Sequence, residues 1–177
     1  MLINDLRKII KEKRLNLSKI EVENLSKMIE NNFFSLDCLA NKTNFFIYNS
    51  IKNEVDTSPI IKRLKGQNKA ISYPVVIGEN LIPAIPKTNE FERGNFGVLE
   101  PKNYSIMRDI EVVIVPLLLC DAQKNRVGYG KGYYDRFLAD KNVIKIGLAY
   151  DFQVVDGINP NPWDVKLDYI VTPTKII

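Results

Sequence analysis

The sequence contains no histidine. This absence excludes Ser-His-Asp and Cys-His catalysis and every metal site that needs a histidine ligand. Only two cysteines are present, Cys38 and Cys120, and their wide separation excludes a structural zinc site and predicts no disulfide. Chemistry in this chain therefore depends on carboxylates, lysine, arginine, tyrosine, backbone amides and hard divalent ions.

Long apolar runs are also lacking. None approaches the roughly 20 residues that cross a bilayer, and the segment Met1–Asp5 lacks the basic and then apolar pattern of a secretory signal. We therefore expect a cytoplasmic protein with no membrane partner. The length of 177 residues predicts a single domain over residues 1–177, and the hydrophobic fraction of 45% is enough for a folded core.

The sequence has no large excess of charge of either sign, because 25 basic residues face 21 acidic ones and the formal net charge is only +4. Proteins that bind nucleic acids usually concentrate more basic charge on one face or tail, so we expect no nucleic-acid partner. A small positive surplus is consistent with a pocket for an anionic small molecule.

The apolar pattern predicts helices and strands in alternation. Residues 4–34 form one apolar stripe of helical period, interrupted at Asn16–Ser18, and Ser18 with Glu21 has the form of a capping box. Further helices are predicted at Ser58–Lys65 and Tyr133–Lys141. The strand-like runs are Asn44–Tyr48, Ala70–Ile77, Leu81–Ile85, Ile110–Val115, Val143–Ala149 and Tyr169–Val171. This order predicts an α/β sheet flanked by helices, with two long irregular connections at Pro86–Tyr104 and Pro116–Lys131.

The most informative segment is a glycine-rich run that leads into a predicted helix. Its alternating glycines can direct backbone N–H groups into one concavity, and its basic residues add positive charge. The residues concerned are Arg126, Gly128, Gly130, Lys131 and Gly132. Asp135 follows closely enough to hold a Mg²⁺ ion that bridges phosphate oxygens. The segment therefore predicts a site for a nucleoside triphosphate.

Two familiar phosphate-binding motifs are excluded. Lys131 is followed by Gly132 rather than by Ser or Thr, so the segment is no Walker loop. The glycine spacing G-x-G-x-G also differs from the G-x-G-x-x-G of dinucleotide-binding folds. A glycine-rich turn with packed tyrosines remains the structural alternative.

Several motifs, in order along nearly the whole chain, resemble those of the 5-formyltetrahydrofolate cyclo-ligase family. The glycine-rich run resembles the family signature, and the blocks on either side of it match as well. The matching pieces are Leu6-Arg7, Asn53–Thr57, Phe96-Gly97, Glu100-Pro101, Val115-Pro116, Asp121, Lys145–Tyr150, Gln153, Trp163–Val165 and Leu167–Thr172.

This resemblance implies an enzyme that is dependent on ATP and Mg²⁺ and converts 5-formyltetrahydrofolate to 5,10-methenyltetrahydrofolate. ATP would phosphorylate the formyl oxygen, N10 would attack the activated carbon, and ADP and phosphate would be released. The implied fold is a three-layer sandwich with a mostly parallel sheet, similar to sugar-phosphate isomerases and CoA transferases. We expect a monomer, and the positive charge favours a polyglutamylated, anionic folate.

The resemblance also implies roles for single residues. Lys131, Tyr134 and Glu54 are the predicted catalytic residues, and Asp135 with Asp168 are the predicted Mg²⁺ ligands. The folate is predicted to contact Glu54, whose carboxylate would accept pterin N–H groups, together with Phe96 and Tyr133. The predicted ATP-binding residues are Arg7, Arg126, Gly128, Tyr129, Gly130, Lys131, Gly132, Tyr133 and Tyr134.

Each role has a plainer structural alternative. Asp168 can serve as a helix cap or in a salt bridge. Either Tyr133 or Tyr134 can belong to the core, and Phe96 can also be a core residue. The chain departs from the family pattern at Ile3, where a lysine is usual, and at Leu117–Cys120, where a glycine-containing stretch is usual. Lys8, Lys11 or Arg14 can replace the charge that is missing at Ile3.

Two other functions remain open at this point. The chain can be a noncatalytic module whose basic glycine loop holds a nucleotide or RNA. It can also be a family paralogue that acts on another pterin or heterocycle. Glu54 and Phe96 distinguish the second alternative, because both belong to the folate side of the site.

Overall fold

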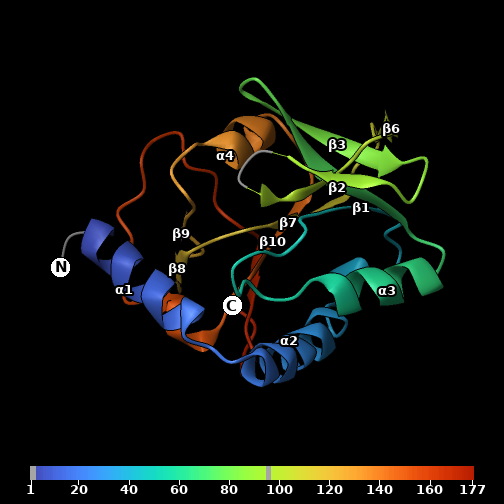
Figure 1. Cartoon of the computed structure of the whole chain (residues 1–177). Helices are drawn as coiled ribbons and strands as arrows, with labels where there is room; N and C mark the ends of the chain where they lie inside the picture. The colour runs from blue at the N-terminus through green and yellow to red at the C-terminus, as the bar shows by residue number, and fades with distance from the viewer. Residues whose placement is uncertain (1–2, 95–96) are drawn as a thin grey trace.

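We describe a computed structural model of the chain, which covers residues 3–94 and 97–177 (Figure 1). The α-helices are α1 (Ile3–Leu15), α2 (Lys19–Phe33), α3 (Ser58–Gly66) and α4 (Tyr133–Leu138), with short 3₁₀ helices η1 (Asp37–Leu39) and η3 (Asp151–Gln153). The strands are β1 (Asn44–Ile47), β2 (Ala70–Ile77), β3 (Asn80–Pro86), β4 (Phe91–Arg93), β5 (Leu99–Pro101), β6 (Tyr104–Ile106), β7 (Val112–Val115), β8 (Leu119–Asp121), β9 (Arg126–Val127), β10 (Ile144–Leu148), β11 (Val154–Val155) and β12 (Tyr169–Val171).

A mostly parallel sheet forms the centre of the described chain. Its seven strands follow the order β12-β10-β7-β1-β2-β3-β6. The pairs from β12 to β2 are parallel, while β3 and β6 add an antiparallel edge. Strand β7 lies within the sheet and every residue of Val112–Val115 is buried. This agrees with its continuous apolar sequence, because a parallel strand covered on both faces exposes no side to water.

Helices cover both faces of this sheet, so the fold has three layers. Side chains that alternate along β1 point to opposite faces. Phe45 and Ile47 pack with Ile29 of α2 and Ile60 of α3 in one core cluster. Phe46 faces the other side, in a second cluster with Leu138 of α4. The prediction of an α/β sheet flanked by helices is confirmed.

A smaller cluster attaches α1 to the rest of the molecule. Ile10 packs with Leu118, Leu119 and Val127, and the partly buried Leu6 adds to the cluster. Figure 1 shows α1 beside β8 and β9, which follow the carboxyl end of β7. The first helix therefore reaches the edge of the sheet at which the chain leaves β7.

Most predicted elements are confirmed. The helical region breaks between Leu15 and Lys19 as expected, and Ser18 with Glu21 forms the capping box. Two predictions are wrong in detail. The stretches expected to be irregular contain the small sheet β4-β5 and the strands β8 and β9, which pair with each other. These strands of two or three residues carry too little periodicity to be recognised. Helix α4 also ends at Leu138 and not at Lys141.

None of the helices in the described part of the chain is long and apolar enough to cross a membrane.

Candidate active site

Glu54 lies in a tight turn beyond the carboxyl end of β1. Lys52 and Asn53 take left-handed backbone conformations, with φ of 49° and 57°. The Glu54 amide donates to the Ile51 carbonyl at 2.9 Å, and the Ile51 amide donates to Glu54 Oε2 at 2.9 Å. This turn directs the Glu54 carboxylate inward, where the residue is 7% exposed. Burial raises the pKa of Glu54, while hydrogen bonds from Tyr129 and Ile51 act in the opposite direction.

The end of α1 is tied to this turn by one side chain. Asn53 Nδ2 lies within hydrogen-bond distance of the backbone carbonyls of Arg14, Leu15 and Leu17, at 3.3, 3.2 and 2.9 Å. The last carbonyls of a helix lack partners along the helix. The Arg14 carbonyl also accepts from the Leu17 amide at 3.2 Å, and Asn53 supplies a further donor to the chain where α1 ends. The last turn of α1 is therefore held directly against Glu54.

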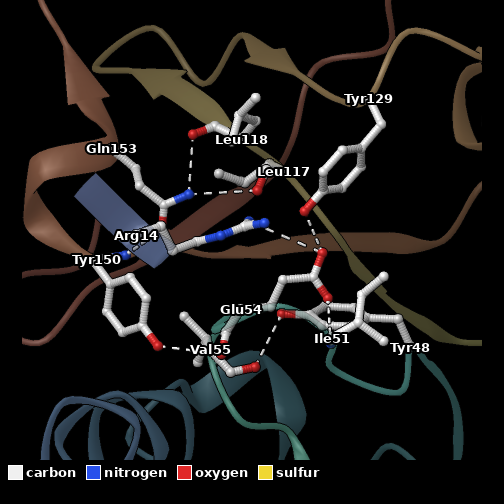
Figure 2. A network of polar contacts seen from close by, with 10 residues as sticks. All are labelled: Arg14, Tyr48, Ile51, Glu54, Val55, Leu117, Leu118, Tyr129, Tyr150 and Gln153. Atoms are coloured by element: carbon white, nitrogen blue, oxygen red, sulfur yellow. Dashed lines mark hydrogen bonds and ion pairs between the residues drawn. The ribbon is translucent and has the colours of Figure 1, made fainter. Parts of the chain in front are cut away.

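Arg14 is the residue that this arrangement brings to Glu54. It is only 1% exposed, and its Nη1 lies 4.0 Å from Glu54 Oε1. Within the described residues, Nε, Nη1 and Nη2 of Arg14 donate no hydrogen bond. Figure 2 shows the guanidinium pointing toward the Glu54 carboxylate, which Tyr129 approaches from another side.

Tyr129 connects the glycine-rich segment to Glu54. Its hydroxyl donates a hydrogen bond to Glu54 Oε1, and the Arg14 guanidinium lies 5.6 Å from the centre of its ring. The residue is 49% exposed, so its ring covers the pair from the solvent side. Burial, and then the negative charge of Glu54, raise the pKa of Tyr129. Tyr129 was predicted to bind ATP, and its hydroxyl donates to Glu54, the carboxylate that is predicted to bind folate.

The glycine loop takes conformations that need its glycines. Gly130 and Gly132 have φ of +91° and +66°, which residues with a Cβ atom rarely adopt. A Cβ on Gly132 would also come within 2.9 Å of Arg136 Nη1. Lys131 lies between them with an exposed side chain, and its carbonyl accepts from Arg136 Nη1 at 2.9 Å. The loop therefore presents a lysine to solvent on a backbone fixed by left-handed residues.

Arg7 of α1 also reaches this loop. Its Nη2 lies 3.4 Å from the Gly128 carbonyl and 3.9 Å from the position of a Cβ on Gly130. The structure therefore brings together Arg7 and the glycine loop, which are far apart in sequence and were both predicted to contact ATP.

Arg126 and Asp135 form an ion pair beneath the loop. Arg126 Nη2 lies 2.7 Å from Asp135 Oδ1, which also accepts from the Val165 amide at 3.1 Å. Burial lowers the pKa of Arg126, while the charges of Asp135, then Tyr134 and then Asp164 act to raise it. Arg126 was predicted to face phosphates, and in this structure its guanidinium is held by Asp135.

Asp168 lies elsewhere. Its Oδ2 accepts from the Lys145 amide at 2.7 Å and lies 3.0 Å from Lys145 Nζ. Asp168 precedes β12 and Lys145 is at the start of β10, so both lie at the amino edge of the parallel strands. The structure thus gives Asp135 and Asp168 separate partners and does not form the expected pair. Among the described residues, no group of three or more His, Cys, Asp or Glu residues forms a metal cluster.

The two tyrosines of α4 point in different directions. Tyr134 stacks on Phe46, with ring centres 6.1 Å apart, and burial followed by the charge of Glu54 raises its pKa. The Tyr133 hydroxyl lies 3.5 Å from the Gly78 carbonyl in the β2–β3 turn. Tyr134 therefore packs against β1 within reach of the Glu54 charge, whereas Tyr133 faces the β2–β3 turn. Phe96 lies outside the described residues.

Sequence reasoning did not assign two residues of this region to the places that they take. Arg14 was considered only as a charge that can replace the lysine missing at Ile3, and Asp164 only as part of the matching block Trp163–Val165. Arg14 follows Ile10 by four residues and so continues the buried stripe of α1; an arginine on an apolar stripe was the available signal. Asp164 precedes Val165, whose amide contacts Asp135, and its charge acts on Arg126. Nothing in its local sequence indicates that contact.

Comparisons with known proteins agree on one family. The model of the 5-formyltetrahydrofolate cyclo-ligase family matches residues 3–173. The 5-formyltetrahydrofolate cyclo-ligases of Mycoplasma pneumoniae and Mycoplasma genitalium are 35% and 33% identical, each over 95% of this chain and 96% of the relative. The NMR structure of Aquifex aeolicus 5,10-methenyltetrahydrofolate synthetase is 32% identical and superposes with a TM-score of 0.88, over 99% of this chain and 92% of that one.

Proposed function

The chain belongs to the 5-formyltetrahydrofolate cyclo-ligase family, and on that premise we propose that it converts 5-formyltetrahydrofolate to 5,10-methenyltetrahydrofolate with ATP and Mg²⁺. The observation that carries the proposal is the hydrogen bond from Tyr129 to Glu54. It joins the basic glycine loop, suited to phosphates, to a buried carboxylate, suited to the N–H groups of a pterin. A single domain over residues 1–177 contains both parts.

We assign ATP to the glycine loop and α1. Lys131 supplies positive charge between the left-handed Gly130 and Gly132, and Arg7 supplies it from α1, where its guanidinium reaches the Gly128 carbonyl. Lysine acts as a point charge on phosphate oxygens, and arginine offers several N–H donors. Arg126 has a supporting role, because its guanidinium holds Asp135 beneath Gly128.

The folate is assigned to the side of Glu54. The carboxylate accepts N–H groups of the pterin, and Tyr134 of α4 is within reach of the Glu54 charge, which raises the pKa of this tyrosine after the larger effect of burial. Phosphoryl transfer needs positioning and charge neutralisation more than a strong base. The site then performs the reaction by holding the formyl oxygen in line with the γ-phosphate, so that this oxygen attacks the γ-phosphorus and ADP leaves. N10 attacks the formyl carbon, whose oxygen now carries the phosphoryl group. N10 loses its proton, the C–O bond to phosphate breaks, and phosphate departs with that proton as the ring closes.

Asp135 fits a Mg²⁺ ion. Its Oδ1 is engaged by Arg126 and Val165, while Oδ2 accepts no hydrogen bond within the described residues. Mg²⁺ is typically held by one or two carboxylates together with substrate phosphates and water, and it neutralises charge on the phosphates. Asp164, beside Val165 and acting on Arg126, is the second carboxylate available here. We therefore propose Asp135 with Asp164, and not Asp168, as the ion's protein ligands.

This assignment predicts a contrast between variants. Asp135→Asn should raise the Mg²⁺ concentration needed for half-maximal ATP binding by at least about tenfold, because a ligand loses its charge. Asp164→Asn should act in the same direction. Asp168→Asn should leave this Mg²⁺ concentration unchanged, since Asp168 pairs with Lys145 at the other edge of the sheet. Calorimetric titration of ATP at several Mg²⁺ concentrations measures this, and equal effects of Asp135→Asn and Asp168→Asn would refute the assignment.

The reaction itself is tested directly. Purified protein, Mg²⁺-ATP and 5-formyltetrahydrofolate are mixed, and the near-ultraviolet band of the methenyl product is followed. We expect the band to grow only when ATP and Mg²⁺ are both present. A flat trace with ATP binding confirmed separately would contradict the proposed substrate and favour a paralogue that acts on another heterocycle.

A further inference from the structure

Arg14 is the one buried cation beside Glu54 in the described structure that no part of the proposed reaction yet uses. Burying a guanidinium is strongly unfavourable unless its N–H groups are paired. Arg14 is 1% exposed, and Nε, Nη1 and Nη2 donate no hydrogen bond within the described residues. Its nearest acidic partner, Glu54 Oε1, is 4.0 Å away, which is beyond hydrogen-bond distance. The guanidinium thus has no acceptor at hydrogen-bond distance within the described residues, although it lies next to the Glu54 carboxylate and to Tyr129.

Glu54 and Arg14 together present a definite hydrogen-bonding pattern. The carboxylate can accept at up to about four lone-pair positions, and Tyr129 and Ile51 use two of them. A donor from Arg14 lies directly beside the remaining acceptors. An acceptor-acceptor-donor row of this kind is complementary to a ligand edge that reads donor, donor, acceptor.

The pterin of a folate has such an edge, with its 2-amino group, N3–H and 4-oxo oxygen side by side. We propose that Arg14 is a specificity-determining residue that donates a hydrogen bond to the 4-oxo oxygen of the folate while Glu54 accepts from the 2-amino group and N3–H. This inference rests on the proposed function and adds a residue to it.

Tyr129 shows how the pair stays protected without substrate. Its hydroxyl donates to Glu54 and its ring lies over Arg14, so it holds the place that the pterin would take. It is 49% exposed and lies between Gly128 and Gly130, the second of which has a φ of +91°. Under this proposal the pterin displaces the Tyr129 hydroxyl from Glu54, and Tyr129 lies on an exposed loop rather than in the core.

The attachment of Arg14 supports a binding role. The carbonyl groups of Arg14, Leu15 and Leu17 are held by Asn53, which is adjacent to Glu54 in the same turn. Because one side chain fixes both the helix end and the turn, the guanidinium and the carboxylate keep a constant separation. Preorganisation of this kind reduces the entropy lost when a ligand binds.

The test compares two ligands in the wild type and in Arg14→Met. The ligands are 5-formyltetrahydrofolate and its 4-amino-4-deoxy analogue, in which an amino group replaces the 4-oxo oxygen. N3 also loses its proton in the analogue, so part of any preference belongs to Glu54. The quantity of interest is therefore the change in the ratio of the two dissociation constants, measured by calorimetry without ATP.

We expect Arg14→Met to reduce the preference for the 4-oxo ligand by about tenfold, the effect of about 1.4 kcal/mol. A purely structural role would weaken both ligands equally and leave the ratio unchanged, and a ratio within twofold of the wild type would overturn the proposal. Lys13→Met is the matched control, because Lys13 is an exposed neighbour on α1 that contacts the Phe152 ring at 5.0 Å. It should leave the ratio unchanged.

Arg14→Lys covers the case in which Arg14→Met does not fold. It keeps the positive charge beside Glu54 but reduces the donors, so we expect a ratio about threefold below the wild type. An unchanged ratio in this variant also overturns the proposal. If the wild type binds neither ligand, the proposed function fails as a whole, whereas tight binding with an unchanged ratio rejects only the role of Arg14.

Discussion

Replacing Lys131 with methionine should reduce the rate of ATP-dependent turnover by roughly 100- to 1,000-fold, the range for removing one charge that stabilises a transition state. The physical reason is the position of Lys131 on the glycine loop. Its side chain is exposed, it lies between two left-handed glycines, and Arg7 reaches the same loop. A phosphate held there would lose its closest mobile cation, while methionine fills a similar volume.

Folding should be unaffected, because exposed substitutions usually change stability by less than about 0.5 kcal/mol. Product formation and thermal unfolding are therefore measured on the same preparation. Lys62→Met is the matched control, since Lys62 is exposed on α3, away from the glycine loop. Unimpaired turnover in Lys131→Met would remove the glycine loop from the phosphate site, and equal loss in both variants would point to a general charge effect.

The fold was largely predictable because its central elements have clear patterns. Val112–Val115 is a continuous apolar run, and such a run in an α/β chain belongs to a strand covered on both faces. Ser18 and Glu21 mark the start of α2 through local chemistry alone. The strands β8 and β9 were missed because their pairing depends on contacts between Leu119 and Val127 across a turn, which no short-range pattern reveals.

The site was predictable only where one segment carries it. The glycine loop with Lys131 is contiguous, and its conformation follows from its glycines. Ion pairs could not be predicted in this way, because the sequence around a carboxylate does not indicate which distant basic residue it will pair with. Asp135 pairs with Arg126, and Asp168 pairs with Lys145. The expected pairing of Asp135 with Asp168 was based on resemblance, and the three-dimensional arrangement favours Asp164 as the neighbour of Asp135.

Glu54→Gln should raise the KM for 5-formyltetrahydrofolate by about 100-fold and leave ATP binding within about twofold. A neutral amide can accept at only one of its two terminal atoms, so N–H groups of the pterin lose a partner. The variant also leaves Arg14 without its opposing charge, and a lost partner of a buried ion pair is strongly unfavourable. ATP binding is spared because the phosphates are assigned to Lys131 and Arg7.

The pH dependence gives this prediction a second readout. Burial raises the pKa of Glu54 above its usual value, so its carboxylate gains a proton as the pH falls through this raised pKa. The KM for folate should therefore increase at acidic pH in the wild type, at a higher pH than an ordinary glutamate would cause. Glu54→Gln should remove that dependence, because an amide does not titrate in this range.

The control is Glu23→Gln, which neutralises an exposed glutamate that pairs with Lys19 on the surface of α2. It should change neither KM, since exposed pairs of this kind contribute little. Steady-state kinetics with each substrate varied in turn, from about pH 5 to pH 8, separates the cases. If Glu54→Gln weakens folate and ATP equally, the carboxylate supports the whole site and does not bind the pterin. If only folate weakens and the acidic dependence disappears, the buried charge itself recognises the substrate.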